Sequence, residues 1–198
     1  MFSLILSILV ISYIVVHIPF DIYMMSKRDR SKPLFDYGIN SSDRLNALMG
    51  LISIAMWLFW LANCFPNLAS TLFRPPLIVN YPMVKLFGSI LASIGVLLAI
   101  MARIARGKFA PSWGLNDTIP LITSGPYHWV RHPSYTFYML MFIALPLITG
   151  YIPSLLLLAG IPVYYKISKD EERLLVHHFG EAYISYQHST GRFVPKFS

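Results

Sequence analysis

The feature that most constrains this chain is a series of apolar runs, each close to the length of a membrane-crossing helix. Such a helix needs about 20 mostly apolar residues, with a range of about 17–25. Only 13% of the 198 residues are charged, against roughly 25% in a soluble domain. The pattern therefore predicts an all-α integral membrane protein with five transmembrane helices. The five candidate spans are Phe2–Phe20, Leu45–Phe65, Leu86–Ala105, Tyr135–Thr149 and Tyr151–Ile167.

The residues that flank the fourth and the first of these runs indicate whether each run spans the membrane. The fourth is short and contains Pro146, but Gly150 and Pro153 favour a tight turn after it, so we expect the fourth and fifth runs to form a helical hairpin. A re-entrant pair that does not cross the bilayer is the alternative. The first run lacks the basic segment and the cleavage site of a signal peptide, which favours a membrane span.

The distribution of basic residues predicts the orientation in the membrane. Fourteen of the 16 lysines and arginines fall in the segments that alternate onto one side. The positive-inside rule places that side in the cytoplasm, with the N-terminus outside and the C-terminus inside. The net charge of +7 then serves topology and contact with anionic membrane lipids rather than binding of nucleic acid. A single cysteine, Cys64, excludes a disulfide within the chain.

Two polar segments, 103–134 and 166–198, hold five of the six histidines and five of the nine acids. In the first, Pro133 suits the first turn of the fourth helix. A helix that begins there offers unpaired N–H groups and a positive dipole end, which suit a carboxylate or phosphate. Arg131 and His132 lie just before it. They are expected to line a cytoplasmic site, or else to anchor the chain among lipid headgroups.

The second polar segment continues the fifth span as a helix to about Phe179, where Gly180 can end it before a shorter helix follows. Asp170, Glu171 and Glu172 lie at its membrane boundary, where three consecutive acids are unusual. They form either a solvated collar or a wall that faces the basic segment. A pocket between the two segments would suit a zwitterionic ligand with an aromatic group.

A metal site is not predicted from the histidines. His128 and His132 are four residues apart, but Pro133 interrupts the helix that would align them. Six histidines are also too few for the histidine boxes of membrane di-iron enzymes. The sequence has no Gly-rich phosphate loop and no serine nucleophile elbow.

The motif pair "TSGPYHWVRHPSY" and "DEERLLVHHFGEAYISY", separated by the expected hairpin, resembles the isoprenylcysteine carboxyl methyltransferase family, which is related to phospholipid N-methyltransferases. The resemblance covers roughly Leu121–Pro195. It implies that S-adenosylmethionine donates a methyl group to the carboxylate of a prenylated cysteine, or to a similar lipophilic acceptor that enters from the bilayer. S-adenosylhomocysteine would be the other product.

The resemblance also implies the roles of individual residues. The residues expected to bind the cofactor are Leu121, Ile122, Tyr127, His132, Pro133, Ser134, Tyr135, Glu171 and Glu172. Those expected to act in catalysis are Glu171, Arg173 and Arg131. Some family members carry a basic residue where this chain has Ile167, so the residue that anchors the substrate stays open between Lys166, Arg173 and Arg192.

We therefore expect one membrane domain over residues 1–198, with three N-terminal spans in 1–110 and a cofactor-binding region in 111–198. Two alternatives keep the membrane location but change the activity: a phospholipid N-methyltransferase, and a non-enzymatic lipid-binding protein. A membrane sterol reductase shares similar motifs, but such chains are longer and have more spans.

Overall fold

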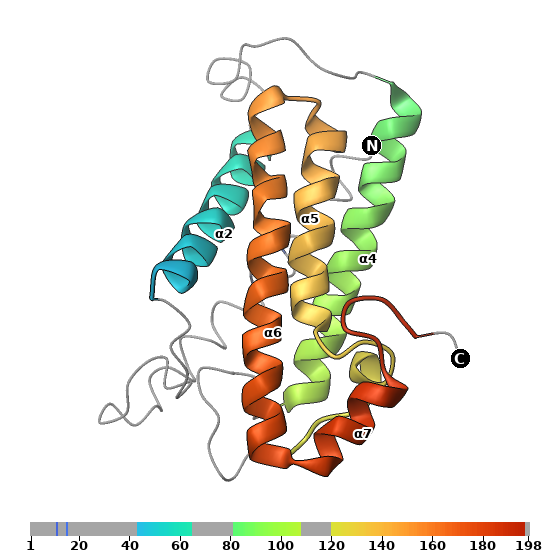
Figure 1. Cartoon of the computed structure of the whole chain (residues 1–198). Coiled ribbons are helices and arrows are strands. Elements are labelled where there is room, and N and C mark those ends of the chain that lie inside the picture. Colours follow the sequence, from blue (N-terminus) through green and yellow to red (C-terminus); the bar gives the residue numbers. More distant parts are fainter. Residues whose placement is uncertain (1–10, 12–14, 16–42, 65–80, 108–119, 197–198) are drawn as a thin grey trace.

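The computed structural model describes residues 11, 15, 43–64, 81–107 and 120–196. Within these ranges the chain forms five α-helices, two 3-10 helices and no strand. The α-helices are α2 (Asp43–Cys64), α4 (Pro82–Arg106), α5 (Pro133–Thr149), α6 (Gly160–Phe179) and α7 (Glu181–Ser189), and the 3-10 helices are η2 (Gly125–His128) and η3 (Ile152–Ala159). Figure 1 shows α4, α5 and α6 side by side, with α2 against α6 and with α7 folded beneath one end of the bundle.

Helices α4 and α5 approach closely because α4 presents small residues to its neighbour. Gly88, Ala92, Gly95 and Ala99 are all buried on that face. A Cβ atom on Gly88 would lie 2.9 Å from the Cβ atom of Leu147, so only glycine fits here without a shift. Small residues that let two backbones approach are typical of helix pairs in membranes.

Membrane-spanning length is met by one helix of the described part of the chain. Helix α4 is long and apolar enough to cross a bilayer, whereas α5 has 17 residues and the apolar part of α2 covers Gly50–Phe59. The first predicted span lies outside the described residues except for Ile11 and Val15. The structure thus supports an all-helical fold with one clear candidate span, and the five-span topology stays a prediction.

The predicted hairpin is present, but its second arm is not one regular α-helix. Helix α5 ends at Thr149, and Gly150 adopts a left-handed conformation with φ of 69°. Its N–H group donates a hydrogen bond of 2.8 Å to the carbonyl oxygen of Pro146. The chain then runs as the 3-10 helix η3 before α6 begins. Pro162, in the first turn of α6, has no N–H group to bond the preceding turn, which explains why the α-helix starts there.

The core between the helices is aromatic and leads directly to the polar end of the bundle. Phe137, Phe142 and Tyr164 are fully buried, and the hydroxyl groups of Tyr164 and Ser53 lie 2.7 Å apart, which ties α6 to α2. The Tyr164 ring also contacts that of Tyr135, in the first turn of α5, with 5.3 Å between the ring centroids. The packed rings therefore fix the position of the first turn of α5, where the predicted site begins.

Candidate functional site

The polar end of the bundle is closed by the C-terminal part of the chain. We call residues 187–193 the C-terminal strap. It pairs with the segment before α5, with a parallel bridge between Val130 and Gly191. The N–H groups of Arg131 and His132 donate to the carbonyl oxygens of Gly191 and Arg192, at 2.8 and 3.1 Å. Pro133 is buried in the first turn of α5, as predicted.

Glu172 is the centre of this arrangement. Its side chain is only 4% exposed, and each of its two carboxylate oxygens accepts two hydrogen bonds. Oε1 accepts from Arg131 Nε at 2.8 Å and from His132 Nε2 at 3.1 Å. Oε2 accepts from Gln187 Nε2 at 3.1 Å and from Arg192 at 2.5 Å. Burial raises the pKa of Glu172, but His132, Arg192 and Arg131 lower it far more, so the carboxylate is ionised and fully occupied.

Arg131 joins the same network from the strap side. Besides Glu172, its guanidinium donates to the carbonyl oxygens of Thr190 and Gln187, and its side chain is 9% exposed. The structure thus gives Arg131 a clear binding partner on α6 and two on the strap. Its expected role in catalysis stays a prediction.

His132 lies between the two carboxylates of α6. In addition to the bond to Glu172, its Nδ1 lies 3.4 Å from Oε2 of Glu171, an ion-pair distance. Its ring stacks on that of Tyr135, with centroids 5.4 Å apart and an interplanar angle of 3°. Burial lowers the pKa of His132, but Glu171 and Glu172 together raise it above the ordinary value of 6.5. The two carboxylates therefore favour the protonated form of this buried ring.

Glu171 differs from its neighbour because its carboxylate is not fully occupied. Its Oε2 atom is buried and accepts no hydrogen bond within the described part of the chain, while the side chain as a whole is 23% exposed. Burial raises its pKa, but His132 and then Arg106 and Tyr135 outweigh burial and lower it. Glu171 is thus an anion with an acceptor position to spare.

Tyr127 completes the cluster from the turn before α5. Burial raises the pKa of its hydroxyl group, and Arg106, Glu171 and Ser134 lie close enough to influence it. The hydroxyl group of Tyr186 on α7 donates a 2.5 Å hydrogen bond to the carbonyl oxygen of Tyr127. Tyr127, His132, Ser134, Tyr135 and Glu171, predicted from two distant motifs, therefore gather at one end of the bundle.

The part of the chain that contains this cluster matches a known protein family. The family model of phospholipid methyltransferases matches residues 83–182, about half of the chain, from the start of α4 to the first turn of α7. The chain belongs to the phospholipid methyltransferase family. That family is related to the isoprenylcysteine carboxyl methyltransferases, so the predicted kinship is confirmed. No curated protein matches the chain.

Membership of this family indicates a membrane methyltransferase. Methyltransferases of such families generally use S-adenosylmethionine. The matched range includes Arg131, His132, Glu171 and Glu172, and it excludes the strap at residues 187–193. The methyl acceptor is not specified by the match.

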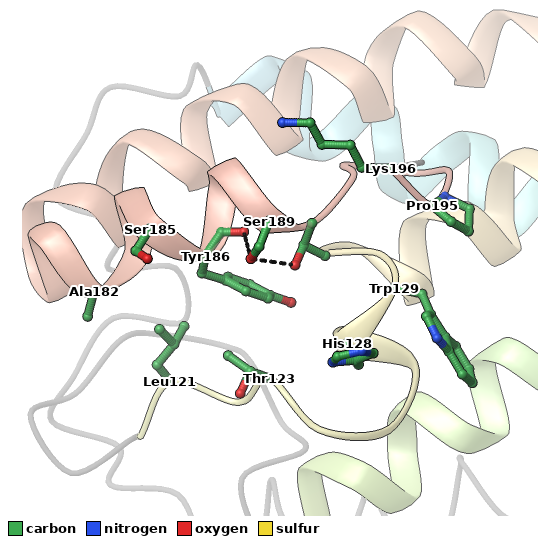
Figure 2. Close-up of a pocket in the computed structure, with 11 residues that line it drawn as sticks. Leu121, Thr123, His128, Trp129, Ala182, Ser185, Tyr186, Ser189, Pro195 and Lys196 are labelled. Carbon is green, nitrogen blue, oxygen red and sulfur yellow. Dashed lines mark hydrogen bonds between the residues drawn. The ribbon is translucent and has the colours of Figure 1, made fainter. Parts of the chain in front are cut away.

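Other predicted site residues of the methyltransferase lie outside the cluster. Leu121 lines a cavity of 450 Å³ between the segment before η2 and α7. Figure 2 shows that hydroxyl groups of Thr123, Ser185 and Tyr186 border this cavity. Ile122, half-buried, follows Leu121 on the same segment. The side chain of Arg173 is 68% exposed and pairs with Asp170 at 3.2 Å.

A second cavity of 360 Å³ is lined in part by Glu172. Three cations line it, together with Glu172, Val176 and Gln187: Lys169, Arg173 and Arg192. Lys169 and Arg192 also lie over the ring of Tyr165, at 5.9 and 5.4 Å from its centroid. Glu172 is the one acid in this lining and faces three cations, so the lining of the cavity carries a net positive charge.

Sequence reasoning did not predict the contacts that the strap and α4 make with this cluster, although it named Arg192 as a candidate for anchoring the substrate. Gln187 and Arg192 bond Glu172, and Arg106 at the end of α4 faces Tyr127 and Glu171. The run Ser189–Thr190–Gly191 marks a loop in the sequence, but no periodicity relates a loop to a helix partner 20 residues earlier. Only the folded chain reveals that pairing.

Proposed function

We propose that this protein is an S-adenosylmethionine-dependent methyltransferase that modifies a lipophilic acceptor at the membrane. We infer that the acceptor group is the carboxylate of a prenylated cysteine or a similar lipophilic acid. The observation that carries the proposal is the buried Oε2 atom of Glu171, which lies 3.4 Å from Nδ1 of His132 but accepts no hydrogen bond from any described residue. Glu171 lies within the part of the chain that the methyltransferase family matches. A buried carboxylate oxygen that accepts no hydrogen bond can still accept one from a further donor, such as an ammonium group.

The cluster fits the chemical groups of the cofactor. Glu171 would hold its ammonium group, and Arg106 supplies a cation near Glu171 for its carboxylate. Tyr127 and Tyr135 offer aromatic surface for the adenine base. The bound cofactor would supply an activated methyl group on a sulfonium centre.

The state of the two glutamates favours an acceptor that is already ionised. Both have lowered pKa values, and Glu172 is occupied by four donors, so neither is a good proton acceptor near neutral pH. A carboxylate needs no general base, since it is ionised well below pH 7. What the protein must do is hold the two reactants in line and exclude water.

The cationic cavity beside Glu172 supports the same class of acceptor. Lys169, Arg173 and Arg192 would attract a carboxylate by charge. A lipid tail could then remain in the bilayer while its polar end lies at the polar end of the bundle. In this proposal Arg173 contributes to acceptor binding.

A phospholipid amine is the second candidate acceptor, and the description of the matched family favours it. An amine must lose a proton before it attacks a methyl group, so its methylation should increase with pH through the alkaline range. A carboxylate acceptor should show no such alkaline increase. Methyl incorporation into a farnesylcysteine analogue and into phosphatidylethanolamine, measured across pH, separates the two acceptors.

Binding of S-adenosylhomocysteine to the purified protein tests the proposal directly. We expect Glu171→Gln to weaken binding by about tenfold or more, because the lost charge-assisted hydrogen bond contributes about 1.5–3 kcal/mol. Glu181→Gln is the matched control, since Glu181 is an exposed acid in the first turn of α7. No binding by the wild-type protein, in detergent and in lipid bilayers, would contradict the proposal. Binding without methyl transfer to any lipid would instead favour a lipid-binding protein.

A further inference from the structure

The C-terminal strap is attached to the predicted site by side chains that lie beyond the range of the family match. The family match ends at residue 182, whereas Gln187 and Arg192 donate to the buried carboxylate of Glu172. The strap also supplies carbonyl oxygens to Arg131 and to the hydroxyl group of Thr136, through Thr190 and Phe193. It is therefore fixed to α5 and α6 at once.

These contacts form a continuous series that leads to the carboxylate of Glu171. Arg192 bonds Oε2 of Glu172, and Oε1 of Glu172 bonds Nε2 of His132. The other ring nitrogen of His132, Nδ1, lies 3.4 Å from Oε2 of Glu171. Phe193, next to Arg192, packs against the His132 ring, with centroids 6.0 Å apart. The strap thus limits the movement of His132 through both a charged and an apolar contact.

We propose that Arg192 is a positioning residue of the methyltransferase, which acts through Glu172 and His132 to hold Glu171 ready for the cofactor. This inference rests on the proposed function and adds the strap to the site. Arg192 need not touch the cofactor, because its effect is transmitted by the hydrogen bonds of Glu172.

Charge explains why one arginine should matter so much. Glu172 is shared by Arg131, His132 and Arg192. Without Arg192 one carboxylate oxygen would keep only the neutral amide of Gln187, and a buried charge that loses a partner is costly. The carboxylate would then shift towards its remaining cations, and His132 would move with it away from Glu171. Lysine in place of Arg192 would keep the charge but lose the fixed planar geometry of the guanidinium.

The affinity for S-adenosylhomocysteine of the full-length protein, measured by calorimetry, tests the inference. We expect Arg192→Gln to weaken binding about tenfold and Arg192→Lys to restore part of the loss. Lys85→Gln is the matched control, since it removes a positive charge from the first turn of α4, at the opposite end of that helix from Arg106; its affinity should be unchanged. Gln187→Met removes the strap's neutral donor to the same oxygen and should weaken binding about threefold, which keeps the test valid if Arg192→Gln fails to fold.

A double-mutant cycle distinguishes action through Glu172 from a direct contact. If Arg192 acts through Glu172, then Glu172→Gln combined with Arg192→Gln should bind no more weakly than Glu172→Gln alone. Additive losses would overturn the proposed route, and wild-type affinity in both Arg192→Gln and Gln187→Met would overturn the positioning role while leaving the proposed function intact. A wild-type protein that does not bind would instead remove the proposed function, and the positioning role with it.

Discussion

At the scale of single residues, two adjacent glutamates of α6 have different surroundings because one helical step turns them by about 100°. Glu172 points into the bundle and is occupied by Arg131, His132, Gln187 and Arg192. Glu171 keeps a buried oxygen that accepts no hydrogen bond from the described residues. The first links α5, α6 and the strap, and the second is the residue that we propose to bind the cofactor.

The occupied state of Glu172 predicts that its charge stabilises the fold far more than that of its exposed neighbour pair Asp170–Arg173 does. Glu172→Gln leaves Arg131, His132 and Arg192 without their counter-ion, so we expect it to destabilise the protein by about 3–5 kcal/mol. Thermal unfolding without ligand measures this loss. Asp170→Asn is the control, since its partner Arg173 is exposed and the pair should contribute less than about 1 kcal/mol. Equal effects at the two positions would contradict the role given to Glu172.

His132 predicts how stability depends on pH. Its pKa is raised above 6.5 by Glu171 and Glu172, the two carboxylates that face it from α6. The stabilisation by the imidazolium is thus complete below about pH 6.5 and is lost as the pH rises through the raised pKa. We expect the melting temperature to fall on the alkaline side, and His132→Gln to reduce that fall. His188→Gln, at an exposed histidine, should keep the wild-type profile, and an unchanged profile in His132→Gln would exclude this explanation.

Residue-level prediction from the sequence succeeded where two motifs carried opposite charges. Arg131 and His132 on one side, and Glu172 on the other, were each expected at a common site, and the structure brings them into contact. The contacts of Gln187, on α7, and of Arg192 with Glu172 are not predicted by the sequence, because they depend on how the chain after α6 folds back. Such a contact leaves no periodic signal in the sequence.

At the scale of the elements, proline and glycine gave the helix boundaries. Pro133 opens α5, Gly150 ends it, and Gly180, with φ of 56°, separates α6 from α7. The same reasoning failed for Ile152–Ala159, where an apolar run predicts an α-helix and the chain adopts a 3-10 helix. Hydrophobicity alone does not distinguish these two helices. Pro162 interrupts the backbone bonding, and its influence on the preceding turn was not anticipated.

The packing of α4 against α5 gives a prediction at this scale. Gly88→Ala would place a Cβ atom 2.9 Å from Leu147 and 3.1 Å from the carbonyl oxygen of Ala144, so we expect a loss of stability of about 1–3 kcal/mol from overpacking. Gly50→Ala in α2 is the control, since no atom lies within 4 Å of the added group and helix propensity favours alanine. Thermal unfolding in detergent compares the two. A Gly88→Ala variant as stable as the wild type would show that α5 can move aside.

At the scale of the whole molecule, an apolar bundle and a polar site share the same helices. Helix α4 presents exposed apolar side chains along most of its length, as at Phe87, Ile94, Leu97 and Ile104, and it ends in Arg103 and Arg106. The start of α5 and the end of α4 lie at the same end of the bundle (Figure 1). The polar cluster therefore lies at the basic end of the candidate span. An acceptor with a lipid tail could therefore reach the site from the membrane without first entering water.

This arrangement predicts on which side of the membrane the site lies. If α4 crosses the bilayer and the basic segments lie inside, then Tyr81, before α4, faces outward, and Lys196, near the strap, faces the cytoplasm. Cys64 is the only cysteine, so a Cys64→Ser background allows Tyr81→Cys and Lys196→Cys to be labelled singly with a membrane-impermeant maleimide in intact cells. We expect label at position 81 only, and label at 196 only after the membrane is opened. Labelling of both positions from outside would show that α4 does not separate the two compartments and that the site is not cytoplasmic.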